Sequence, residues 1–158
     1  MNNLSGKTAI LYRRVSTTEQ KDFGMSLSNQ TERLQDFCKR NSVEIIGDFE
    51  EDYSAKNFSR PNFSEMLKFV VKNKNRIDYL LIYKWDRFSR NHYDSMTVIR
   101  QLQKLGITVN TVEQPLDITN PDDKILFSIY LSMPEVENDK IGIRTTEGSR
   151  RARLEGCW

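Results

Sequence analysis

Apolar residues recur along the first 112 positions with two alternating periods. Short runs rich in β-branched and aromatic residues predict strands, and apolar residues three and four positions apart predict helices. The predicted strands are residues 7–12, 43–49, 78–83 and 107–112. The predicted helices are residues 28–41, a segment opened by Arg60-Pro61, and residues 94–105 with Gly106 as the stop signal. This alternation predicts an α/β fold with a mainly parallel sheet of four to five strands flanked by helices.

The chain after residue 120 follows a different pattern. Asn120 and Pro121, followed by two aspartates, are typical of a helix start, and the helix is predicted to run to about residue 153. Its first half carries apolar residues on several faces, namely Ile125, Leu126, Phe127, Ile129, Tyr130, Leu131 and Met133. A single domain cannot cover all of these faces, so a partner chain is expected. The alternative is an ordinary core helix with a solvated tail. Pro134 is expected to kink or break the helix.

The composition describes a polar chain with enough residues for a core. The 158 residues include 24 basic and 22 acidic side chains, so the net charge of +2 says little about partners. No stretch approaches the length of a membrane span, and the N-terminus lacks the apolar segment of a signal peptide. Cys38 and Cys157 form no metal-ligand pattern. We therefore expect no membrane association and a reduced, cytoplasmic setting.

Candidate chemistry begins where the first predicted strand ends, at Arg14 and Ser16. Further arginines follow the second and third strands, at Arg60, Arg87 and Arg90. In a parallel sheet these strand ends meet at one edge, where ligands bind. Guanidiniums gathered around one serine require an anion, and their planar forks match phosphate oxygens. Arg87 and Arg90 share a face if their turn is helical. Taken alone, Ser16 has another interpretation, as a capping residue beside a solvated Arg14.

The absence of several motifs reduces the number of candidate reactions. There is no G-x-S-x-G elbow, and the only histidine, His92, is expected at the surface, so a Ser-His-Asp hydrolase is disfavoured. No phosphate-binding P-loop is present, which disfavours nucleotide hydrolysis. No carboxylate pair or histidine set indicates a two-metal nuclease. A serine among arginines suits covalent attack on a phosphodiester, with fixed positive charge stabilising the transition state.

These residues form part of a series of motifs that resembles the catalytic domain of the serine recombinases. That family comprises resolvases, invertases and the large serine integrases and transposases. The matching motifs are Tyr12-x-Arg14-Val15-Ser16-Thr17, Gln30, Asp52-x-Ser54 with Arg60-Pro61, Asp86-Arg87-x-x-Arg90, Glu137 and Arg144-Thr145 to Gly148. The likeness extends over nearly the whole chain, and the stretch 150–158 favours the large class.

The resemblance implies a role for each matching residue. Ser16 is implied to be the nucleophile, which attacks the scissile DNA phosphate, becomes linked to the 5′ end and frees a 3′ hydroxyl. Arg14, Arg87 and Arg90 resemble the residues that clamp this phosphate, and Arg60 resembles an additional arginine of a mobile loop. The other matches are Asp86, as the acid that holds the arginines in register, and, as supporting residues, Tyr12, Gln30, Asp52, Ser54 and Glu137. Which group takes the serine proton stays open.

The resemblance also implies the partners. The family needs no metal and no high-energy cofactor, because the phosphoserine bond stores the phosphodiester energy. The substrate is double-stranded DNA, and the protein is expected to be a homodimer that forms a tetramer in the synaptic complex, where subunits rotate. Such a protein is cytoplasmic and derived from a bacterium or a phage. Basic residues of the long helix are expected to contact DNA phosphates, namely Arg144, Arg150, Arg151 and Arg153.

We therefore expect residues 1–121 to form a resolvase-like catalytic domain and residues 122–158 to form a long helix for dimer and DNA contact. The DNA-binding domain that follows in this family is expected to be absent from this chain. A rival hypothesis is a non-catalytic phosphate- or DNA-binding module that dimerises through the long helix. For such a module Ser16 would be dispensable.

Overall fold

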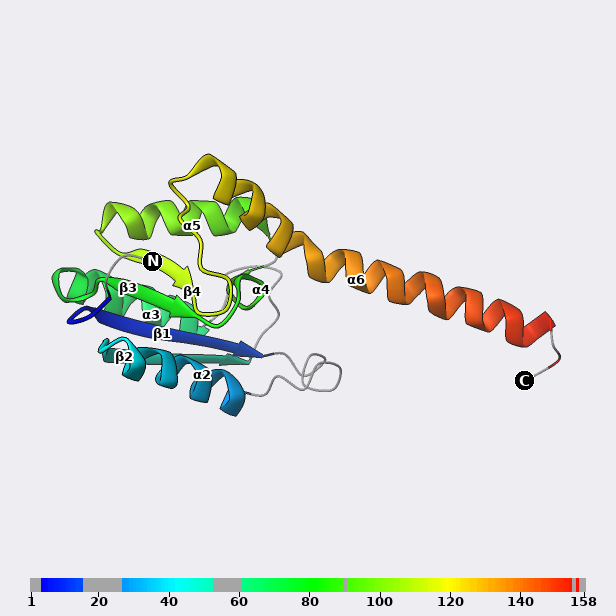
Figure 1. The fold of residues 1–158 in the computed structure, drawn as a ribbon, viewed down its shortest axis with the longest axis horizontal. Coiled ribbons are helices and arrows are strands. Elements are labelled where there is room, and N and C mark those ends of the chain that lie inside the picture. The colour runs from blue at the N-terminus through cyan, green and yellow to red at the C-terminus, as the bar shows by residue number, and fades with distance from the viewer. Residues whose placement is uncertain (1–3, 16–26, 53–60, 90, 155, 157–158) are drawn as a thin grey trace.

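The computed structural model describes residues 4–15, 27–52, 61–89, 91–154 and 156. The elements in chain order are β1 (Thr8–Val15), α2 (Leu27–Arg40), β2 (Glu44–Asp52), α3 (Pro61–Asn73), η1 (Lys74–Arg76), β3 (Tyr79–Ile82), α4 (Trp85–Phe88), α5 (His92–Lys104), β4 (Thr108–Thr111) and α6 (Pro121–Leu154). Figure 1 shows an α/β unit from which most of α6 projects. Within the described ranges, no helix is long and apolar enough to cross a membrane.

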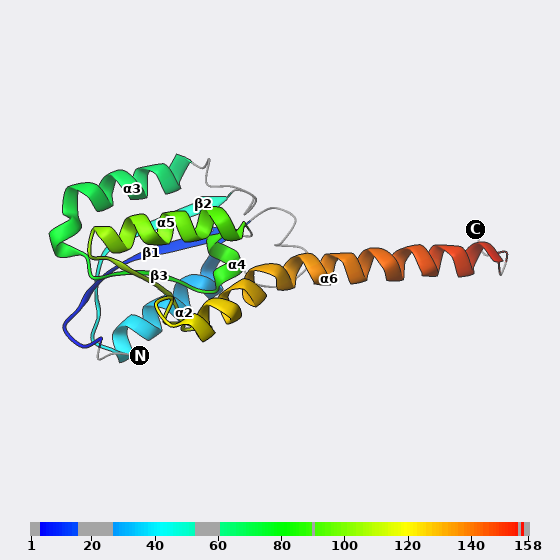
Figure 2. The same ribbon diagram turned by 90° about the horizontal axis from the view of Figure 1, so that it is seen from above.

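The strands form one parallel sheet in the order β2-β1-β3-β4. Alternate residues of β1 enter two different cores: Ala9 and Leu11 pack on the face covered by α2, and Ile10 and Tyr12 pack on the face covered by α3 and α5. Figures 1 and 2 show α2 on one side of the sheet and α3 and α5 on the other. Both faces are buried, which explains the nearly continuous apolar runs in the sequence. The predicted fold class is confirmed.

Two strands are longer than predicted, because polar residues extend them. β1 continues to Val15 instead of ending at residue 12, and β2 continues to Asp52 instead of residue 49. The added residues pair in register, with Arg13 opposite Glu50. The guanidinium of Arg13 also forms ion pairs with Asp48 at 2.9 Å and with Glu50 at 3.2 Å. Opposite charges on neighbouring strands stabilise the pairing, so Arg13 and Arg14 lie in the strand and not in a turn after it.

The long helix α6 begins as predicted and has no break. The side-chain oxygen of Asn120 accepts a hydrogen bond from the backbone N–H of Asp122 at 3.1 Å. The backbone remains helical from Pro121 to Leu154, so of the kink or break expected at Pro134 the break does not occur. A proline inside a helix removes one backbone bond, and the turns on both sides of it retain theirs.

Only part of the apolar surface of α6 is covered in the single chain. Phe127 and Leu131 are buried against the domain. The apolar residues that remain exposed are Ile125, Leu126, Ile129, Met133, Val136, Ile141, Ile143 and Leu154. An ordinary core helix with a polar tail does not explain this row of exposed side chains.

A buried carboxylate fixes the start of α3. Glu51, near the end of β2, is 2% exposed. Its Oε2 atom accepts the backbone N–H groups of Asn62 at 3.0 Å and Phe63 at 3.1 Å. These donors lie in the first turn of α3, where backbone N–H groups have no partner within the helix. Glu51 therefore ties the end of β2 to the beginning of the next helix.

We predict that Glu51→Ala lowers the free energy of unfolding by about 2 kcal/mol, because it leaves two helix-terminal N–H groups without their charged acceptor. Urea unfolding followed by circular dichroism measures the loss. The matched control is Glu65→Ala, which removes an exposed carboxylate from the same helix and should change stability by no more than about 0.5 kcal/mol. Equal stability of the Glu51→Ala variant and the parent would contradict the capping role.

Candidate active site

The site is built around the buried guanidinium of Arg14. Arg14 lies near the carboxyl end of β1 and is fully buried. Its Nε donates to the backbone carbonyl of Arg87 at 3.1 Å, and its Nη2 donates to the carbonyl of Asp86 at 3.2 Å. Asp86 and Arg87 belong to α4, which follows β3, the neighbour of β1 in the sheet. Two of the sequence motifs, more than 70 residues apart, therefore meet through direct hydrogen bonds.

The two matching residues of α4 interact with each other. A carboxylate oxygen of Asp86 lies 3.5 Å from Nε of Arg87, and the Arg87 residue is 7% exposed. A buried charge of this kind needs a nearby counter-charge or hydrogen-bond acceptor. The predicted role of Asp86, which is to hold the arginines in register, stays a prediction.

The sequence places Arg87 and Arg90 on one face only if their turn is helical, and α4 does not extend that far. The helix α4 ends at Phe88, and Ser89 has extended dihedral angles of −161° and 159°. Two residues three positions apart lie on one face of a helix only where the helix is continuous between them. Arg90 itself lies outside the described residues.

Gln30 and Tyr12 support the end of β1 from two sides. Gln30 of α2 is fully buried, and its Nε2 donates to the backbone carbonyl of Arg14 at 3.1 Å. Tyr12 is also fully buried, and its ring packs edge-on against Phe63 of α3 with centroids 5.3 Å apart. Phe63 in turn contacts Phe88 of α4 at 6.0 Å. Tyr12 thus supports the site from within the core.

Several predicted site residues lie outside the described residues, and their roles stay predictions. These are Ser16, Ser54, Arg60 and Arg90, together with the side chains of Asp52 and Glu137. The backbone places Asp52 at the end of β2 and Glu137 within α6.

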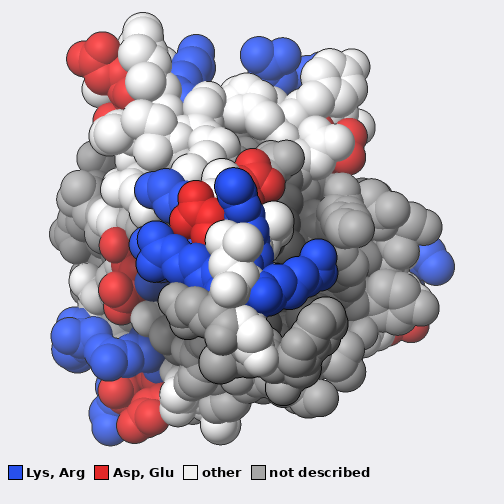
Figure 3. Space-filling model, turned by 90° about the vertical axis from the view of Figure 1, so that its right-hand side faces the viewer, with Lys and Arg blue, Asp and Glu red and all other residues white. Residues whose placement is uncertain are grey.

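The basic residues expected to contact DNA are exposed on the projecting part of α6, and they are Arg144, Arg150, Arg151 and Arg153. Figure 3 looks at the molecule from the side on which α6 projects and shows basic side chains gathered near the middle of this face, with acidic ones among them. This part of the helix extends away from the sheet in Figures 1 and 2.

Two titratable groups of the fold, Tyr83 and Cys38, have raised pKa values. Burial and the neighbouring Glu113 carboxylate raise the pKa of Tyr83, so its phenol stays protonated at neutral pH. Burial raises the pKa of the Cys38 thiol to about 11, which leaves it un-ionised. His92 is exposed at the start of α5, as predicted, with its ring 5.5 Å from that of Phe127. In the described part of the chain, no group of three or more His, Cys, Asp or Glu residues could hold a metal ion.

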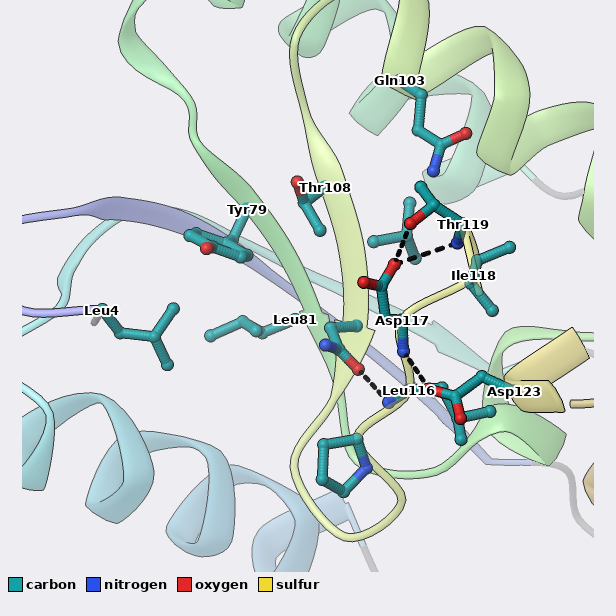
Figure 4. Close-up of a pocket in the computed structure, with 13 residues that line it drawn as sticks. Leu4, Tyr79, Leu81, Gln103, Thr108, Leu116, Asp117, Ile118, Thr119 and Asp123 are labelled. Carbon is teal, nitrogen blue, oxygen red and sulfur yellow. Dashed lines mark hydrogen bonds between the residues drawn. The ribbon is translucent and has the colours of Figure 1, made fainter. Parts of the chain in front are cut away.

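A cavity of about 480 Å³ lies away from these arginines, beside β3 and β4. Leu4, Tyr79 and Leu81 line it together with the segment that follows β4 (Figure 4). Its polar groups bond to one another: Asp117 accepts the backbone N–H of Thr119 at 2.9 Å, and Asp123 accepts that of Asp117 at 2.7 Å. The site residues described above are not among those that line the cavity, so the cavity is separate from the candidate site.

Sequence patterns missed two contributors to the site. Trp85 is fully buried at the start of α4, and its indole packs edge-on against Phe127 of α6 at 4.8 Å. Gln114, in the segment after β4, accepts two hydrogen bonds from Trp85. The position of Trp85 directly before the Asp86-Arg87 motif was a possible signal. Nothing in the local sequence marks Gln114.

The fold and the site define an α/β domain of the resolvase type. The chain belongs to the resolvase family, since the family model "Resolvase, N terminal domain" matches residues 9–158. The resemblance inferred from the motifs is thereby confirmed.

Individual relatives agree with the family match. A DNA-invertase of Escherichia phage P1 is 29% identical over 148 residues, which cover 92% of this chain and 70% of the invertase. The transposon Tn917 resolvase of Enterococcus faecalis is 26% identical over 145 residues, covering 92% of this chain and 71% of the resolvase.

Solved structures show the same fold. A resolvase family site-specific recombinase from Streptococcus pneumoniae is 30% identical, with a TM-score of 0.61 and coverage of 93% of this chain and 99% of that one. The N-terminal catalytic domain of TP901-1 integrase has a TM-score of 0.64 at 23% identity and covers 84% of this chain and 98% of its own. The latter likeness is evidence for the fold alone.

We predict that Arg14→Lys lowers the free energy of unfolding by about 2 kcal/mol, because one ammonium cannot reproduce the two-carbonyl fork of a guanidinium. Arg76→Lys, which changes an exposed arginine of η1, is the control and should cost no more than about 0.5 kcal/mol. Urea unfolding of both variants tests the contrast. Equal losses from the two substitutions would show that the bonds from Arg14 to α4 do not stabilise the fold.

Proposed function

We propose that this chain is a site-specific serine recombinase, which cleaves and rejoins double-stranded DNA through a covalent bond to Ser16. The observation that carries the proposal is the pair of hydrogen bonds from Arg14 to the carbonyls of Asp86 and Arg87. These bonds join a strand residue two positions before Ser16 to the helix that carries Arg87, which we propose to bind the phosphate. Membership of the resolvase family supports the same reaction, since its relatives are named invertases and resolvases.

In the proposed reaction, Oγ of Ser16 attacks the scissile phosphorus and loses its proton. The bond between phosphorus and the 3′ oxygen breaks, the 5′ phosphate stays on the serine, and the 3′ oxygen leaves as a hydroxyl. Rejoining is the reverse attack by a 3′ hydroxyl, so the phosphodiester energy is retained. Arg14, Arg87 and Arg90 supply fixed positive charge to the phosphate oxygens in the transition state, and no metal ion is required for this.

The segment between β2 and α3 supplies Arg60 in this proposal. Arg60 directly precedes Pro61, the first residue of α3. The bonds of Glu51 to Asn62 and Phe63 fix that helix start beside the end of β2. An arginine attached to this anchored position can act on the same phosphate, with Asp52 and Ser54 as supporting residues.

The proposed assembly uses α6 in two ways. Its exposed apolar residues, which include Ile125, Ile129 and Met133, would pack against a second copy in a dimer, and Glu137 would lie at this contact. The exposed arginines farther along the helix would bind DNA phosphates and so position the duplex without specifying its sequence. Two dimers would form the tetramer in which strands are exchanged. A protein that acts on bacterial or phage DNA works in the cytoplasm.

We predict that Ser16 forms a covalent DNA adduct without added metal. The whole chain, joined at residue 158 to a homeodomain of known specificity, which folds without metal, is incubated in EDTA with DNA in which two homeodomain sites flank a randomised core. The reaction is then denatured, and mass spectrometry locates any nucleotide on the protein. An adduct on Ser16 is expected.

Ser16→Ala should abolish this adduct and leave folding and DNA binding intact. The control Ser5→Ala removes an exposed hydroxyl at the other edge of the sheet and should react like the parent. If several linkers and cores yield no adduct on bound DNA, the chain is not a recombinase. DNA binding by the chain without the fused domain would then identify the phosphate-binding module.

We also predict that Arg87→Ala slows adduct formation by roughly two orders of magnitude, equivalent to about 3 kcal/mol of transition-state stabilisation. The measurement is the single-turnover rate at saturating DNA. Arg76→Ala, which removes an exposed arginine from η1, is the control for the loss of positive charge. A rate for Arg87→Ala within twofold of the parent would remove Arg87 from the phosphate clamp.

A further inference from the structure

The start of α4 is capped by a residue from a distant segment. The residue in the N-cap position, Lys84, makes no side-chain capping bond, and a lysine has no acceptor to offer. The backbone N–H of Trp85, the first residue of α4, instead donates to Oε1 of Gln114 at 3.2 Å. Gln114 therefore satisfies a helix-terminal donor that its own helix cannot satisfy.

Gln114 holds Trp85 at a second point. The indole Nε1 of Trp85 donates to the backbone carbonyl of Gln114 at 2.9 Å. Trp85 is fully buried, so its main-chain and side-chain donors both need a protein acceptor. Gln114 supplies an acceptor to each of them.

The position of Gln114 is itself fixed by the sheet. After β4, the backbone N–H of Val112 donates to the carbonyl of Ile82 at 3.0 Å, and that of Glu113 donates to Tyr83 at 3.2 Å. These bonds continue the pairing of β4 with β3 as far as the residue before Gln114. The segment 112–114 thus follows the segment 82–85 from the end of the sheet to the start of α4.

A helix as short as α4 depends on such external bonds. Four residues cannot form a stable helix alone, because nucleation is unfavourable. Gln114 bonds the first residue of α4, and Arg14 bonds the carbonyls of Asp86 and Arg87 in its later part. These two groups hold α4 at its two ends, and Arg87 is a residue of this helix.

We propose that Gln114 is a positioning residue for the phosphate clamp, acting through Trp85 to hold α4 and with it Arg87. The proposal rests on the recombinase function proposed above. Gln114 does not touch the phosphate and acts only through Trp85. Its side-chain oxygen keeps the first turn of α4 in place, so that Arg87 does not need to be reoriented when DNA binds. Preorganised charge of this kind is what stabilises a transition state.

The test compares variants that keep or remove the acceptor. Gln114→Met has a similar length and no strong acceptor, and Gln114→Glu retains an oxygen in the same place. Asn41→Ala is the matched control, because it removes one side-chain bond of 2.8 Å, to Phe37 at the end of α2. The single-turnover rate of the Ser16 adduct at saturating DNA, the DNA half-saturation point and urea stability are measured for each protein in the same homeodomain fusion.

We expect Gln114→Met to form the adduct about tenfold more slowly than the parent, since one buried donor loses its acceptor. The half-saturation point should not move, because the homeodomain sets DNA affinity. Gln114→Glu should react within threefold of the parent, and Asn41→Ala should react at the parent rate even where its stability falls. A parent-like rate for Gln114→Met, or equal slowing by Met and Glu, overturns the proposal.

A second measurement separates this inference from the function itself. If the parent forms no adduct, the recombinase proposal fails, and the positioning role is judged by nuclear magnetic resonance. Gln114→Met should speed hydrogen exchange of the Trp85 amide about tenfold and shift the Nε–H signals of Arg14 and Arg87, while Gln114→Glu and Asn41→Ala leave them in place. Unchanged exchange and unchanged arginine signals in Gln114→Met overturn the positioning role.

Discussion

The guanidinium of Arg14 is the group on which the geometry of the site depends. A fully buried positive charge must have acceptors, and Arg14 finds them in the carbonyls of Asp86 and Arg87. The carbonyls of a helix are the negative end of its dipole, which suits a cationic donor. The same bonds fix α4 relative to β1. The parallel pairing of β1 and β3 brings the two motifs to the same edge of the sheet. It does not by itself set the orientation of one motif relative to the other.

An aromatic layer beneath this contact keeps it in place. Tyr12 packs on Phe63, and Phe63 packs on Phe88, so β1, α3 and α4 share a row of rings. Trp85 packs on Phe127 and joins α4 to α6. Edge-on aromatic pairs add a preferred orientation to their buried area. The charged groups of the site therefore pack on a rigid apolar core. The free energy gained by burying these rings offsets the repulsion between the arginines.

The spacing of apolar residues predicted the features that depend on residues close together in the sequence. The order of strands and helices, the stop at Gly106 and the cap at Asn120 all follow from nearby residues. The ends of β1 and β2 were placed too early, because Arg13 and Glu50 form strand only through each other. Glu51 and Gln114 could not be found at all, since each bonds to a backbone N–H that is distant in sequence. The meeting of Arg14 with Asp86 and Arg87 was inferred only at the level of a shared sheet edge.

The helix α6 places the proposed dimer contact close to the site. Phe127 is buried against Trp85, and Ile129 and Met133 on the same helix are exposed. At 1.5 Å per residue, Met133 lies roughly 9 Å along the axis from Phe127. A helix transmits displacement along its length with little loss, because its turns are joined by backbone bonds. A second copy that packs on Met133 therefore acts on the same rigid element that contacts Trp85, and Trp85 begins the turn that carries Arg87. In the proposed dimer, assembly would be coupled to the orientation of the proposed phosphate clamp through the contact between Trp85 and Phe127.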